Sequence, residues 1–147
     1  MKKVLIALDY DQTAQKVAEV GFKLAKSLNA EVVLLHVISN PVFYYSSYMV
    51  MAPLHIKGVH ELKAVSQDFL DKTKHDLGDE SIQTLVIEGD IVESIIETAK
   101  DLNVDIIVLG THSRKWLEDI LVGSVAESVL KQTTLPLFVI PTKKQEQ

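Results

Sequence analysis

Two glycines and a serine in the stretch from Gly110 to Leu130 have the types and spacing that could hold a phosphate chain. Gly110 directly follows the apolar run VDIIVL, and Gly123 and Ser124 precede a segment with helical spacing. A glycine at a strand end lets a ligand approach the backbone, and the unpaired N–H groups of a helix start attract anions. A ligand could therefore approach this strand end, and an anion could bind at this helix start.

Ser124 and Asp9 each have a structural interpretation beside the functional one. Residues 124–127 match the capping box Ser-x-x-Glu, so Ser124 could cap its own helix instead of contacting a ligand. Asp9 follows the first apolar run, where carboxylates are common at a turn into a helix, although Asp11 is better placed as that cap. His112 has no second histidine or carboxylate at ligand spacing, which favours a polar loop residue over a metal ligand.

Several common catalytic and nucleotide-binding signatures are missing from the chain. It has no G-x-x-x-x-G-K-[ST], G-x-G-x-x-G or G-x-S-x-G motif, which argues against a P-loop NTPase, a dinucleotide dehydrogenase and an α/β-hydrolase. Cysteine is absent, so disulfides, thiol catalysis and cysteine metal sites are excluded.

Short apolar runs alternate with segments of helical spacing along the chain. The runs are rich in β-branched residues and nearly continuous, as in strands covered on both faces. They predict strands at residues 4–8, 31–38, 82–88, 105–110 and 135–141, and the helical patterns fall at 14–28, 62–70, 92–102 and 125–130. The alternation predicts an α/β fold, a doubly wound parallel sheet of five strands with helices on both faces.

In such a sheet a ligand binds beyond the carboxyl ends of the strands, where the strand order reverses. The residues at these ends are Asp9, Val37, Ile38, Gly89 and Gly110. The candidate site should therefore form around them.

The length and the net charge of the chain limit the number of domains and the kinds of partner that we expect. The 147 residues, 47% of them hydrophobic, are enough for one ordinary core, so we expect one domain over residues 1–142 and a fraying tail at 143–147. The net charge is -5 and no run of Lys or Arg exceeds two residues, which argues against nucleic acid as a partner. No apolar run approaches the length of about 20 residues that spans a membrane, and the start lacks a signal-peptide core. We predict a soluble cytoplasmic protein.

The connection at residues 39–56 is longer than this fold class needs. It holds three of the four tyrosines, together with Phe43 and two of the three methionines. These side chains could pack over the end of the sheet, form a lid over a ligand or present a surface to a partner.

Five segments of the chain resemble the universal stress protein family. They are VLIALDYDQTA, VVLLHVI, IEGDIVESIIETAK, VDIIVLGTHS and VGSVAESVLKQTTLPLFVIP, and they are spread so that the resemblance extends over nearly the whole length of the chain. The resemblance implies a Rossmann-like sheet with the strand order 3-2-1-4-5.

The ATP-binding subgroup of that family carries a pattern of Gly, two residues, Gly, nine residues, Gly, and then Ser or Thr. The matching positions here are Gly110, Ser113, Gly123 and Ser124, so three of the four agree. Ser113 stands where the subgroup has its second glycine. Its side chain either narrows the phosphate channel or donates its hydroxyl to a phosphate oxygen.

The resemblance also implies roles for individual residues around a bound ATP or AMP. Asp9 would accept hydrogen bonds from the adenine amine or the ribose hydroxyls, Val37 would offer its backbone to the adenine edge, and Gly89 would leave room beside the base. Gly110 would let the chain pass the ribose, and Arg114 is either a solvated loop residue or a source of charge near the phosphates. The full predicted set is Ala7, Leu8, Asp9, Val37, Gly89, Leu109, Gly110, His112, Ser113, Arg114, Gly123, Ser124, Val125 and Ala126.

The function that this resemblance implies is an adenine-nucleotide-binding regulatory protein of the stress response, with magnesium accompanying ATP. It would act through nucleotide-dependent partner contacts, and we assign no catalytic residue, although slow ATP hydrolysis or autophosphorylation stays open. One alternative is a homodimeric interaction module of the same family that binds no nucleotide, which Ser113 favours. Another is an enzyme of the wider adenine-nucleotide α-hydrolase group, whose SGGxDS and HIGH-type motifs are absent.

The last predicted strand, Leu135 to Pro141, should lie at the edge of the sheet in the strand order of this family. Its unpaired N–H and C=O groups would form a template for another chain. We expect two copies to pair there, antiparallel across a two-fold axis, as a homodimer. The alternative is a monomer whose edge is protected by Pro136, Pro141 and the charged tail.

Overall fold

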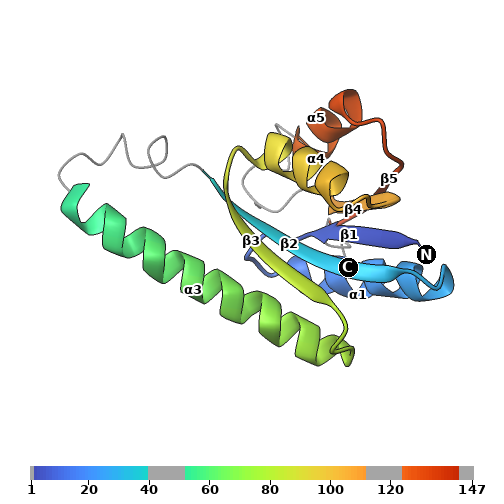
Figure 1. Cartoon of the computed structure of the whole chain (residues 1–147), viewed down its shortest axis with the longest axis horizontal. Coiled ribbons are helices and arrows are strands. Elements are labelled where there is room, and N and C mark those ends of the chain that lie inside the picture. The colour runs from blue at the N-terminus through green and yellow to red at the C-terminus, as the bar shows by residue number, and fades with distance from the viewer. Residues whose placement is uncertain (1, 40–51, 112–123, 143–147) are drawn as a thin grey trace, which may run out of the picture.

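The computed structural model describes residues 2–39, 52–111 and 124–142. Along the chain the elements are β1 (Lys3–Ala7), α1 (Ala14–Ser27), β2 (Glu31–Ser39), α3 (Ala52–Leu77), β3 (Gln83–Gly89), α4 (Ile91–Asp101), β4 (Ile106–Gly110), α5 (Ser124–Gln132) and β5 (Leu137–Ile140). All strand pairs are parallel, in the order β3-β2-β1-β4-β5. The predicted doubly wound α/β fold and its strand order are confirmed (Figure 1).

Helices cover both faces of the sheet. α1 and α3 pack on one face, over Val4 and Ile6 of β1. α4 and α5 pack on the other face, over Leu5 of the same strand (Figure 1). Seven consecutive residues of β2 are buried, because successive side chains alternate between two covered faces.

Most predicted boundaries agree with the structure within two residues, but α3 is much longer than its pattern predicts. We expected a helix at residues 62–70, whereas α3 spans Ala52–Leu77. Leu70 is buried against the sheet, while Leu62 and Val65 are exposed. Because part of this helix buries no apolar face, its amphipathic signal in the sequence is weak.

The predicted connection at residues 39–56 is correspondingly shorter, since its last residues, from Ala52 onward, belong to α3. The interpretations of its aromatic side chains concern residues 40–51, which lie outside the described residues, as does the tail at 143–147. Within the described ranges, no helix has both the length and the apolar character to cross a membrane.

Helix α1 approaches the sheet closely at Gly21. A Cβ atom at this position would lie 2.8 Å from Cδ1 of Ile6 and 3.2 Å from Cγ1 of Val108. Both neighbours are fully buried in the centre of the sheet. The glycine therefore lets α1 lie directly on β1 and β4, which places the start of the helix at the ends of these strands.

Gly21→Val should lower the free energy of unfolding by about 1–3 kcal/mol, because its side chain overpacks a filled region. Lys16→Val is the matched control, since it places the same side chain on the exposed face of α1. The control should cost only helix propensity, less than about 1 kcal/mol. Urea unfolding curves measure both values, and equal losses would contradict the close packing at Gly21.

Candidate functional site

The strand order reverses between β1 and β4, which are neighbours in the sheet. A small cleft of about 30 Å³ opens at their C-terminal ends. Four predicted residues line it: Ala7, Leu8, Asp9 and Gly110. The fold therefore brings together residues that are about 100 positions apart in the sequence.

Sequence reasoning missed Thr13, Ala14 and Val17, which also line this cleft. Thr13 is the N-cap residue of α1 and the other two belong to its first turn. They reach the cleft because α1 contacts both β1 and β4. The signal in the sequence was their position directly after the end of the first strand.

Two aspartates near the cleft have different surroundings. The carboxylate of Asp11 accepts hydrogen bonds from the backbone N of Thr13 (2.8 Å) and from its hydroxyl (2.6 Å). The N-cap residue of α1 is therefore Thr13, and not Asp11 as we predicted. Asp11 instead fixes the position of Thr13 through these two hydrogen bonds. Asp9 is exposed, and its carboxylate has no hydrogen-bond or ion-pair partner within the described part of the chain. It is available to a ligand.

The backbone of Val37 reaches the same end of the sheet because β1 ends before β2 does. The β1–β2 pairing runs to Ala7 opposite Leu35, and one further hydrogen bond joins Leu8 N to Leu35 O at 2.8 Å. The N–H and C=O groups of alternate residues point to the same side of a strand, so those of Val37 point to the space beyond β1. Among the described residues, no backbone hydrogen bond continues the ladder there.

The side chains of three predicted residues point into the core on the face of the sheet that α4 and α5 cover. Val37, Leu109 and Ala126 belong to the apolar cluster between the sheet and the layer of α4 and α5, and Val125 is packed against it. Any contact between these residues and a ligand must therefore use the backbone. Ser124 is the first residue of α5. Outside the described residues lie His112, Ser113, Arg114 and Gly123.

Gly89 has a structural explanation at the end of β3. Its φ angle is 151°, which side chains rarely tolerate, and a Cβ atom would lie 2.9 Å from Oγ of Ser94. The next residue, Asp90, caps α4 by accepting a hydrogen bond from Glu93 N at 2.9 Å. The turn into α4 thus accounts for this glycine, and β2 lies between its strand and β1.

Gly110 leaves space that neighbouring side chains fill. A Cβ atom there would lie 2.9 Å from Cγ2 of Val17 and 2.9 Å from Cγ2 of Thr142. The hydroxyl of Thr111 accepts from Thr142 N at 3.0 Å, and Thr111 N donates to Ile140 O at 3.0 Å. These bonds join the ends of β4 and β5. Packing therefore requires a glycine at this strand end whether or not a ligand binds.

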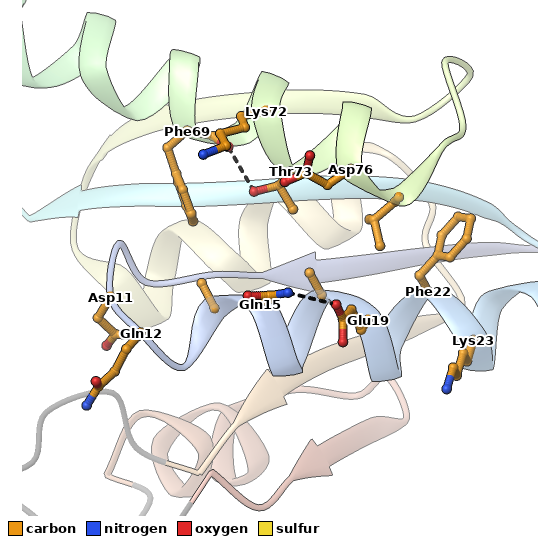
Figure 2. Close-up of a pocket in the computed structure, with 13 residues that line it drawn as sticks. Asp11, Gln12, Gln15, Glu19, Phe22, Lys23, Phe69, Lys72, Thr73 and Asp76 are labelled. Atoms are coloured by element: carbon orange, nitrogen blue, oxygen red, sulfur yellow. Dashed lines mark hydrogen bonds between the residues drawn. The ribbon is translucent and has the colours of Figure 1, made fainter.

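A larger groove of about 420 Å³ lies between α1 and α3 (Figure 2). Ala14 and Ala18 of α1 are among its buried lining residues, and Phe22 and Phe69 contribute aromatic rings from the two helices. Charged side chains of both signs line it as well. The groove was not predicted from the sequence, and its mixed lining selects no particular ligand.

Comparison with known proteins assigns the family. The model described as the universal stress protein family matches residues 1–141. The chain belongs to the universal stress protein family. The universal stress protein MJ0577 of Methanocaldococcus jannaschii is 32% identical to it, over 97% of this chain and 96% of that protein.

Solved structures of this family share the fold. The structure of MJ0577 has a TM-score of 0.79 at 29% identity and covers 98% of each chain. A universal stress protein in complex with cAMP has a TM-score of 0.64 at 17% identity, covering 97% of this chain and 98% of that one. The universal stress protein of Archaeoglobus fulgidus in complex with dAMP has a TM-score of 0.60 at 17% identity, covering 95% of this chain and 98% of that one. At these identities the last two likenesses are of fold alone.

Gly110→Ala should lower the free energy of unfolding by about 1–3 kcal/mol without any ligand, since its Cβ would collide with Val17 and Thr142. Val17→Ala in the same chain should recover part of this loss because it frees space. We expect the two substitutions to couple by more than about 0.5 kcal/mol. Denaturant unfolding of the wild type, the two single variants and the double variant measures the coupling. Additive effects would show that packing does not require this glycine.

Proposed function

We propose that this universal stress protein binds an adenine nucleotide, ATP or AMP, where β1 and β4 end, and that it changes its partner contacts in response. The observation that carries the proposal is the exposed Asp9 carboxylate, which has no partner among the described residues and lines the same cleft as Gly110. An ionised carboxylate only accepts hydrogen bonds, which suits an amine or the ribose hydroxyls. The family members in complex with cAMP and dAMP support an adenine ligand.

The backbone of Val37 supports recognition of the base. Its N–H and C=O groups point beyond the end of β1, where the described ladder has stopped. Adenine presents a ring nitrogen acceptor next to its amine donor, and this pair is complementary to a backbone donor and acceptor. In this proposal the base lies against Val37, and Asp9 binds the amine or the ribose.

The phosphates are assigned to the segment between Gly110 and α5. Gly110 lets the chain pass the ribose, and the N–H groups at the start of α5, from Ser124 to Ala126, face the phosphates. The described cleft of about 30 Å³ is much smaller than a nucleotide site, and the predicted residues His112, Ser113, Arg114 and Gly123 lie outside the described residues. In this proposal magnesium accompanies ATP.

The lining of the cleft favours regulation over catalysis. Phosphoryl transfer needs metal ligands and a residue that orients the attacking group. Asp9 is the one acidic side chain among the described residues of the cleft. We therefore propose no catalytic residue, and the bound nucleotide would act by altering a surface that a partner contacts.

Asp9→Ala should weaken ATP binding about 10- to 100-fold, as expected when hydrogen bonds to a charged group are lost. The free energy of unfolding of the nucleotide-free protein should not change, since the Asp9 carboxylate has no hydrogen-bond or ion-pair partner among the described residues. Thermal shifts with ATP, AMP and cAMP, with and without magnesium, measure binding, because a ligand that binds only the folded state raises the melting temperature.

Asp101→Ala is the matched control, because it removes another exposed carboxylate at the end of α4. A wild-type protein whose melting temperature responds to none of these nucleotides would sink the proposal. That result would favour the alternative, a homodimeric interaction module that binds no nucleotide. Ser113, which stands where the ATP-binding subgroup has a glycine, also favours this alternative.

We further propose that two copies of the chain pair through β5. This strand lies at the edge of the described sheet, with β4 on its other side. Phe138 and Val139 are 37% and 38% exposed, although large apolar side chains in strands are usually covered. Pairing two β5 strands would satisfy the open backbone groups and bury these side chains.

Val139→Lys should convert the proposed dimer into a monomer. Each of the two paired β5 strands would then carry a lysine, and the two like charges would repel each other within a short interface. Gln132→Lys, on the exposed end of α5, is a control that adds the same charge elsewhere. Light scattering at micromolar concentration gives the mass of each protein. A monomeric wild type, or a dimeric Val139→Lys variant, would contradict pairing through β5.

A further inference from the structure

A buried histidine stands where β1 and β2 stop pairing. His36 lies in β2, and its Nδ1 is 2.7 Å from the carbonyl oxygen of Leu8. A carbonyl oxygen can only accept a hydrogen bond, so the imidazole carries a proton on Nδ1 and donates it to Leu8. This bond fixes the orientation of the ring and ties it to the segment that leaves β1.

The bond from His36 stands in place of a backbone ladder bond. Leu8 N donates to Leu35 O, so in a continuing parallel ladder Leu8 O would accept from the N–H of Val37. The described structure has no such bond, and the imidazole holds the Leu8 carbonyl instead. The N–H of Val37 is thereby left without its ladder partner.

Aromatic packing diverts the chain at the next step. A further ladder bond would run from Tyr10 N to Val37 O, but the Tyr10 ring stacks on Phe69 of α3, with centroids 4.7 Å apart and planes at 29°. Phe69 also meets His36 edge to face, at 6.2 Å and 82°. One residue of α3, which Figure 2 shows reaching from the helix toward the strands, therefore packs against both the histidine and the departing segment.

We propose that His36 is a positioning residue that keeps the backbone of Val37 open for the base of a nucleotide. By holding the Leu8 carbonyl it ends the β1–β2 ladder early, and the released N–H and C=O of Val37 become the edge that reads adenine. His36 itself contacts no ligand atom. The role in base recognition rests on the proposed function, whereas the early end of the described β1–β2 ladder at Val37 does not depend on any ligand.

Two variants of His36 separate its hydrogen bond from its volume. His36→Leu removes the donor, and the buried Leu8 carbonyl must then find another one, of which the N–H of Val37 is the next in the ladder. His36→Asn keeps a donor, because the amide nitrogen of asparagine falls near the place of Nδ1. His75→Leu, on the exposed surface of α3, is the matched control.

Amide hydrogen exchange followed by NMR measures the first effect. We expect the Val37 amide of the wild type to exchange faster than the Leu35 amide, which lies within the ladder. His36→Leu should slow exchange at Val37 about tenfold, whereas His36→Asn and His75→Leu should leave it unchanged.

Titration with two ligands measures the second effect. His36→Leu should bind ATP about tenfold more weakly and inorganic triphosphate as well as the wild type does, because only the base contact is lost. His36→Asn should bind both like the wild type. A purely structural defect would weaken both ligands together.

Equal exchange rates of Val37 and Leu35 in the wild type would overturn the role of His36, and this comparison requires no variant to fold. An exchange rate that His36→Leu does not change would overturn it as well, even in a protein that binds ATP. A wild type that binds neither ligand would overturn the proposed nucleotide function, and the exchange rates would then decide separately whether His36 ends the ladder.

Discussion

The end of the pairing between β1 and β2, at Ala7 opposite Leu35, determines where a ligand can reach the backbone of this protein. β1 lies between β2 and β4, so its early end opens the sheet at the point where the strand order reverses. The carboxylate of Asp9, the start of α1 and the end of β4 are all arranged around this opening. A ladder that continued by one more step would close it.

The opening stays narrow because α1 is packed tightly over the same two strands. Gly21 allows the helix to approach Ile6, and Gly110 leaves room for the side chains of Val17 and Thr142. Gly110, which suggests phosphate binding in the sequence, therefore serves first to let a helix pack against the end of a strand. The two roles are compatible, because a strand end without a side chain is also one that a ligand can approach.

The sequence predicts the fold well because the strands are continuous apolar runs separated by helical patterns, and one fold class accommodates that alternation. Asp9 and Gly110 could be placed at the site because they directly follow such runs. The length of α3 could not be predicted, since exposed apolar residues such as Val65 blur its periodicity. The contact from His36 to Leu8 was equally inaccessible, because it joins residues 28 positions apart and the run VVLLHVI shows only one polar residue inside a buried strand.

Backbone NMR of the isotope-labelled wild type during titration with ATP would test whether an adenine nucleotide binds where the strand order reverses. Amide signals report both whether the ligand binds and where. We expect the largest changes at Asp9, Val37 and Gly110, with little change in the groove between α1 and α3. Signals that do not move at high ATP concentration, or changes confined to residues of that groove such as Ala18 and Thr73, would contradict it.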